Sequence, residues 1–97
     1  MEVGKLYKTK KYYWMLYPTK DIAAAAPIAT TAAAAVVAAR YWSKRLNCNV
    51  SYLNPNSIFC SLEQDGKFCR ILSTEGNIGW IYLPGWCKKD IEEVKAE

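Results

Sequence analysis

The side chains of this 97-residue sequence that could do chemistry are its cysteines and a few carboxylates. The chain contains no histidine, so the commonest general base near neutral pH is absent. Cys69 stands beside Arg70, but adjacent residues of a strand point to opposite faces, and Cys87 beside Lys88 is likewise only a sequence adjacency. Three carboxylates lie at expected turns: Glu63, Asp65 and Glu75. Since no GxSxG, P-loop or dinucleotide-binding motif is present, we expect a protein that is not an enzyme.

The cysteines also argue against a metal site. They stand far apart, without a CxxC pair: Cys48, Cys60, Cys69 and Cys87. We therefore expect no bound metal and no cofactor. Because residues 1–14 contain no long apolar stretch, we expect no secretory signal, and we favour reduced, mostly buried thiols over two disulfides. The uncharged run 22–39 is mostly alanine and contains Pro27, so we expect no membrane helix. Reduced thiols without a secretory signal predict a location in the cytoplasm, or within a virion assembled in the cytoplasm.

Aromatic side chains are the main candidates for binding. Four tryptophans and seven tyrosines exceed what the single core of a 97-residue chain can bury. Aromatic residues left at a surface are the usual anchors of protein interfaces. The expected interface residues are Trp14, Tyr41, Trp42, Trp80, Tyr82 and Trp86. We predict a non-catalytic docking or structural subunit of a larger assembly, with a virion component (capsid decoration, neck or tail) as the preferred example.

A basic and aromatic segment near the N-terminus gives an alternative function. The net charge is +4, and this segment combines cations with tyrosines that could contact phosphates and stack on bases. The candidate nucleic-acid contacts are Lys5, Lys8, Lys10, Lys11, Tyr12 and Tyr13. The same mixture is also typical of an ordinary strand whose lysines lie in water, so both interpretations stay open at this point.

The order of the elements predicts an α+β protein of one domain. Residues 1–18 are expected to form the first strand or strands, because they are rich in tyrosine and tryptophan and end at a proline. Residues 19–47 are expected to be a linker and an inserted helix, and residues 48–94 a set of β-hairpins.

Local signals bound the helix at about residues 30–47. The hydroxyl of Thr30 or Thr31 can accept a hydrogen bond from the first turn, and Asn47 is a suitable stop. The 3.6-residue period predicts a polar face made of Arg40, Ser43, Lys44 and Asn47. The packed face is predicted to contain Ala34, Val37, Ala38, Tyr41, Trp42 and Leu46.

Glycine turns divide the C-terminal half into strands. A hairpin turn centred on Asp65 and Gly66 would place Leu62 opposite Cys69. The core face would then hold Ile58, Cys60, Leu62, Cys69 and Ile71. The other face would hold Phe59, Ser61, Glu63, Phe68 and Arg70. Further on, Gly76 is expected to supply a turn and Gly79 a bulge or a close backbone approach.

The stretch KFCRILSTEGNIGWIYL resembles SH3-like barrels, especially the bacterial SH3 type. In that family a strand, a glycine turn and a Gly-Trp-hydrophobic strand are followed by a short closing strand. The matching residues are Gly76, Gly79, Trp80, Ile81 and Leu83, and the resemblance covers about residues 57–94. It implies a small SH3-like antiparallel barrel with one inserted helix, and a structural role for Trp80. Small SH3-like barrels also serve in ribonucleoprotein and transcription complexes, which is the setting for the nucleic-acid alternative.

Overall fold

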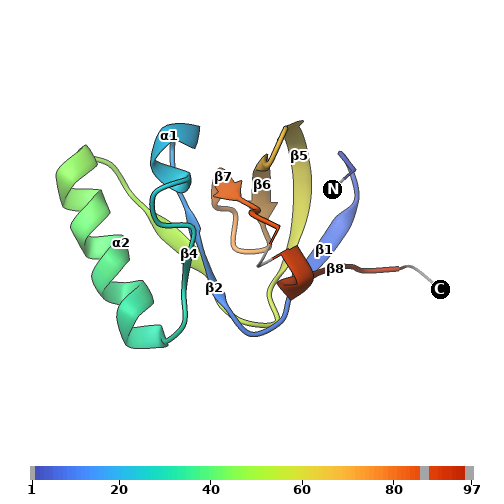
Figure 1. The fold of residues 1–97 in the computed structure, drawn as a ribbon, viewed down its shortest axis with the longest axis horizontal. Coiled ribbons are helices and arrows are strands. Elements are labelled where there is room, and N and C mark those ends of the chain that lie inside the picture. Colours follow the sequence, from blue (N-terminus) through green and yellow to red (C-terminus); the bar gives the residue numbers. More distant parts are fainter. Residues whose placement is uncertain (1, 86–87, 96–97) are drawn as a thin grey trace.

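The computed structural model describes residues 2–85 and 88–95 as an α+β fold with two antiparallel sheets and one main helix (Figure 1). The five-stranded sheet contains, in spatial order, β7 (Ile78–Tyr82), β6 (Phe68–Ser73), β5 (Ile58–Asp65), β1 (Leu6–Thr9) and β8 (Ile91–Glu93). The three-stranded sheet contains β3 (Ile28–Ala29), β2 (Tyr13–Leu16) and β4 (Ser51–Leu53). The helices are α1 (Lys20–Ala23), α2 (Ala32–Leu46) and the short 3-10 helix η1 (Lys88–Asp90). The α+β prediction is therefore confirmed.

The two sheets meet where the end of β2 crosses β7. The Tyr17 N–H donates to the Trp80 carbonyl at 3.1 Å, and the Trp80 N–H donates to the Tyr17 carbonyl at 2.7 Å. A Cβ on Gly79 would lie 3.0 Å from Leu16 Cβ and 3.2 Å from the Tyr17 carbonyl oxygen. Gly79 thus marks the close backbone approach expected from the sequence. The arrangement is compatible with an SH3-like barrel, but within the described residues β7 and β8 are the two opposite edges of the five-stranded sheet and do not pair with each other, so the sheet is not closed.

Helix α2 begins and ends where the sequence predicts. The Thr31 hydroxyl accepts from the Ala34 N–H at 3.1 Å, and Asn47 ends the helix in the left-handed conformation at φ 53°. The packed face is partly different from the prediction. It centres on Ala35 and contains Ala35, Ala38, Ala39, Trp42 and Leu46. Ala34, Val37 and Tyr41 face solvent instead, because methyl side chains on both sides of the helix leave the choice of face to its fit against the sheet.

The β5–β6 hairpin is shifted from its predicted register. Gly66 takes the first central turn position with φ +60°, so Asp65 pairs with Phe68 rather than standing in the turn. A bulge between Ser61 and Glu63 shifts the register again, placing Ser61 opposite Ile71. Since successive strand residues alternate between faces, the extra residue at the bulge inverts the expected face of β5 from Ser61 back to Ile58.

The inverted face of β5 changes which side chains form the core. Phe59 and Ser61 are buried, whereas Ile58, Cys60 and Leu62 are only half-buried on the outer face. The prediction was correct for β6, where Cys69 and Ile71 are fully buried. The first core cluster joins both sheets and contains Tyr7, Trp14, Leu16, Leu53, Phe59, Cys69, Ile71, Ile81 and Leu83. The second lies around α1 and α2 and contains Met15, Tyr17, Ala23, Ala29, Ala35 and Val50.

A buried carboxylate fixes the corner between β1 and β2. Asp90, which is 4% exposed, accepts hydrogen bonds from the backbone N–H groups of Lys10 (3.4 Å), Lys11 (2.8 Å) and Tyr12 (3.1 Å). Its Oδ2 also accepts from Trp14 Nε1 at 2.8 Å. This one side chain therefore ties the C-terminal 3-10 helix to the first two strands.

Candidate functional site

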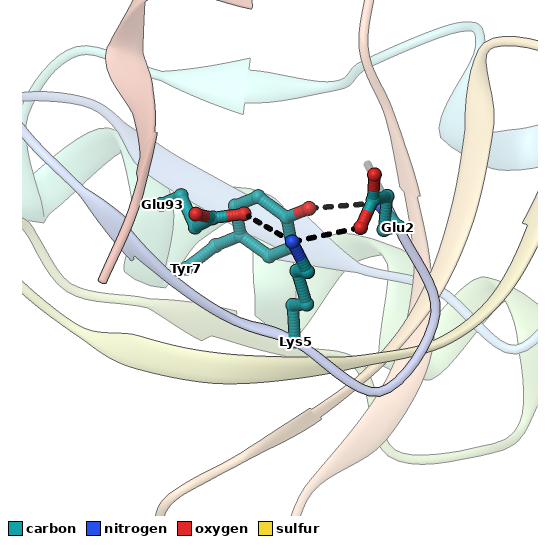
Figure 2. Close-up of polar contacts among 4 residues, drawn as sticks. All are labelled: Glu2, Lys5, Tyr7 and Glu93. Atoms are coloured by element: carbon teal, nitrogen blue, oxygen red, sulfur yellow. Dashed lines mark hydrogen bonds and ion pairs between the residues drawn. The ribbon is translucent and has the colours of Figure 1, made fainter. Parts of the chain in front are cut away.

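The lysines of the N-terminal segment have acidic neighbours in the folded chain. Lys5 Nζ lies 2.8 Å from a Glu2 carboxylate oxygen and 3.3 Å from one of Glu93, and the Glu2 N–H donates to the Tyr7 hydroxyl at 2.7 Å (Figure 2). The hydrogen bond and charge of Lys5 lower the pKa of Glu2, and those of Glu2 and Glu93 raise the pKa of Lys5. A phosphate at this position would compete with two carboxylates.

Two more of the charged candidates, Lys8 and Lys10, are also placed near β8. Lys10 Nζ lies 3.7 Å from a Glu92 carboxylate oxygen, and Lys8 stands opposite Glu92 in the β1–β8 pairing. Acidic side chains that sequence reasoning left out therefore flank the basic strand. Their approach could not be read from the sequence, because β1 and β8 are separated by more than eighty residues.

The two tyrosines of this segment do not form one stacking platform. Tyr12 packs against the first core cluster, and its ring lies 5.1 Å from Lys11 Nζ. Tyr13 packs against the second cluster, with its ring centroid 6.0 Å from that of Tyr52 in an edge-on arrangement. Because the two rings pack on different clusters, they cannot receive successive bases.

The predicted interface aromatics are spread over different parts of the fold. Trp14 is completely buried and bonded to Asp90, so it belongs to the core and is not available to a partner. Trp42 is half-buried against Tyr17, with ring centroids 6.0 Å apart and planes at 87°. Tyr41 is 54% exposed beside Trp42. Trp86 lies outside the described residues.

Trp80 and Tyr82 are brought together with Phe68 at a groove between α1 and the β5–β6 turn. Phe68 pairs with Tyr82 across the β6–β7 ladder, and their ring centroids are 5.0 Å apart. The groove has a volume of about 540 Å³. Its lining consists of Lys20, Asp21, Ala24, Asp65, Gly66, Lys67, Phe68 and Tyr82. Trp80 adjoins it, because Lys20 Nζ lies 5.2 Å from the Trp80 ring centroid.

The charges around this groove balance one another. Lys20 forms an ion pair with Asp65, and the hydrogen bond and charge of that carboxylate raise the pKa of Lys20. Asp21 and Lys67 add one further charge of each sign to the lining. An aromatic floor with a balanced charged rim suits an apolar side chain rather than an ion. Sequence reasoning found Trp80 and Tyr82 but missed Lys20, since residues 19–29 were expected to be a linker.

The cysteines do not form a reactive centre in the described part of the chain. Cys48 is exposed, Cys60 is half-buried and Cys69 is buried, all as free thiols. Burial raises the pKa of the Cys69 thiol, whose Sγ lies 3.1 Å from the Ser61 hydroxyl oxygen. A raised pKa disfavours the thiolate, which is the nucleophilic form.

The described residues form neither a metal-ligand cluster nor a membrane-spanning helix, and the chain matches no known protein. Across residues 2–85 and 88–95, no three histidine, cysteine or acidic side chains lie close enough to hold a metal ion. Among the helices of these residues, none has the length and apolar character needed to cross a membrane. No protein-family model, curated protein or solved structure matches the chain.

Proposed function

We propose that this protein is a non-catalytic docking subunit of a larger protein assembly, formed in the cytoplasm, with a virion capsid decoration, neck or tail component as the preferred example. Its docking site is the groove between α1 and the β5–β6 turn. The observation that carries the proposal is the pair of half-buried rings, Phe68 and Tyr82, in the lining of one groove of about 540 Å³, with the half-buried Trp80 beside it. The expected occupant is an apolar side chain of an extended segment from a partner protein.

The energetics of protein interfaces support this use of the groove. Aromatic anchors in a water-excluding setting supply most of the binding energy of typical interfaces. Here the rings of Phe68 and Tyr82 provide apolar surface that a partner can bury, and Lys20 and Asp65 form an ion pair at the rim of the groove. Because these two charges already pair with each other, neither loses its partner when a bound protein displaces water from the groove.

An SH3-like origin of the C-terminal half forms part of the proposal. Strand β6 is followed by a turn in which Gly76 has φ +88°, by β7 with Gly79 and Trp80, and by the short strand β8. This order is the one that characterises the family, and α2 is then an insertion before it. The groove beside Trp80 would be a feature of that barrel.

Nucleic-acid binding through the N-terminal segment is the second candidate, and it has less support. Lys5 and Lys10 are engaged by carboxylates, and Tyr12 and Tyr13 pack on different clusters. Salt separates the two functions, because phosphate contacts weaken steeply as salt rises and an apolar docking site changes little.

Ligand selection from a randomised peptide library tests the docking proposal. Peptides enriched on the wild-type protein should bind Ala24→Arg at least about tenfold more weakly, because an arginine at this exposed lining position obstructs the groove. The control is Ala25→Arg, the neighbouring exposed alanine, which does not line the groove. Failure to enrich any peptide, or equal binding to both variants, would overturn the proposal. Loss of binding to the wild type at high salt together with a nuclease-sensitive native particle would favour the nucleic-acid alternative.

A further inference from the structure

The outer face of α2 carries most of the basic excess of the molecule. Residues 22–62 contain three cations and no acidic residue, whereas the remaining sequence has ten cations against nine acidic residues, a net +1 of the total +4. The three cations are Arg40, Lys44 and Arg45. All three are exposed, and no carboxylate of the described residues forms an ion pair with them. Lys44 and Arg45 suit the negative end of the helix dipole, but Arg40 lies too far from that end for this explanation.

The same face is apolar along its N-terminal half. Val37 is 66% exposed and Tyr41 is 54% exposed, and both lie one or two turns beyond the exposed Ala33 and Ala34. At i, i+4 and i+8 spacing, Ala33, Val37 and Tyr41 form one continuous stripe. The methyl side chains at the start of this stripe allow the axis of a second helix to come within about 8 Å. Helix α2 lies at one end of the molecule, with β1 and β8 at the other (Figure 1).

We propose that the outer face of α2 binds an acidic amphipathic helix of a partner protein, in antiparallel orientation. The apolar side of that helix would lie on Ala33, Val37 and Tyr41, and its carboxylates would face Arg40, Lys44 and Arg45. The orientation follows from charge: in an antiparallel pair the positive N-terminal end of the partner, where acidic residues are favourable, meets the cationic end of α2. This surface is distinct from the groove beside α1.

The distribution of apolar and charged groups favours a protein partner over nucleic acid. The cations are confined to the last two turns of α2. A nucleic acid could contact these cations through its phosphates, but it would leave the exposed apolar stripe around Val37 without a partner. A second copy of this chain does not supply the required acidic helix from its described residues. Helix α2 itself has no acidic residue, and α1 has only Asp21.

Titration with designed peptides tests the inference. The probe is a fluorescently labelled helical peptide of about 16 residues, with leucines along one side and glutamates in its N-terminal half. Two control peptides are compared with it. One has glutamines in place of the glutamates, and the other has the glutamates in its C-terminal half. The glutamate peptide should bind the wild-type protein about tenfold more tightly than either, as read by fluorescence anisotropy.

Two charge-reversal variants locate the binding surface. Arg40→Glu should weaken the binding of the glutamate peptide about tenfold, while Lys89→Glu, the same charge change at an exposed site on η1, should alter it less than about twofold.

Val37→Asp should also abolish binding, and Ala24→Arg should leave it unchanged, so this result is separable from the groove. Equal binding of the three peptides, no binding at about 1 mM, or binding of oligo-dT but not peptide to the wild type would each overturn the proposal.

Discussion

Replacement of Asp90 by asparagine should lower the free energy of unfolding more than the replacement of an exposed side chain does. Asp90 Oδ2 accepts from the backbone N–H groups of Lys10 and Tyr12 and from Trp14 Nε1, and Oδ1 accepts from the Lys11 N–H. The amide of Asp90→Asn has only one acceptor oxygen, and its NH₂ group would face an N–H donor. At least one donor therefore loses its partner, whichever way the amide is turned.

The magnitude follows from the number and type of these hydrogen bonds. A hydrogen bond to a charged group contributes about 1.5–3 kcal/mol and a neutral one about 0.5–1.5 kcal/mol. The outright loss of one charged hydrogen bond sets the minimum, and the weakening of the other three adds to it, so the free energy of unfolding should fall by at least about 2 kcal/mol. For a domain of this size, such a loss corresponds to a fall in Tm of roughly 10 °C or more.

Equilibrium urea unfolding followed by tryptophan fluorescence measures this loss, because Trp14 lies in the same buried cluster. The control is Glu92→Gln, which removes an exposed carboxylate two positions away whose ion pair with Lys10 spans 3.7 Å. That variant should change the free energy of unfolding by less than about 0.5 kcal/mol. A loss below about 1 kcal/mol for Asp90→Asn, or one equal to the control, would refute the role assigned to this carboxylate.

Three further substitutions probe the close approach, a buried hydroxyl and a helix cap. Gly79→Ala should cost about 1–3 kcal/mol in the same urea titration, since its Cβ would lie 3.0 Å from Leu16 Cβ; an unchanged midpoint would contradict the tight crossing. Burial raises the pKa of Tyr17 to about 12, so above the ordinary value of 10.0 the folded state keeps a proton that the unfolded chain has released. The free energy of unfolding should therefore fall by roughly 2–3 kcal/mol between pH 10 and 12, and this part of the pH dependence should be absent in Tyr17→Phe. Parallel pH profiles for wild type and variant would exclude Tyr17 as the cause. Thr31→Ala should lower the free energy of unfolding by about 1 kcal/mol because the capping hydrogen bond is lost, and Thr30→Ala should lower it much less. A larger effect of Thr30→Ala would show that Thr30, and not Thr31, caps the helix.

The predictable parts of the fold are those fixed by neighbouring residues. Thr31 and Asn47 bound α2 because a capping hydroxyl and a residue tolerant of positive φ act within one helical turn. Gly76 and Gly79 were found because a turn and a close approach each require the absence of a side chain. Trp80 and Tyr82 were recognised as binding candidates from residue type alone, and the groove that gathers them with Phe68 was not.

The sequence by itself thus determined the α+β class, the two ends of α2 and, to within one residue, the turns at Gly66 and Gly76, but it did not show α1 and β3 within the expected linker. Only the tertiary structure decided which side of α2 faces solvent, which face of β5 enters the core, and which aromatic rings are buried. The physical reason is that these choices depend on contacts between distant segments. Asp90 meets Lys11 across 79 positions of the chain, and the acidic residues of β8 come beside the lysines of β1 only after folding. Short-range propensities do not carry such information, because burial is a property of the assembled fold and not of a residue and its neighbours.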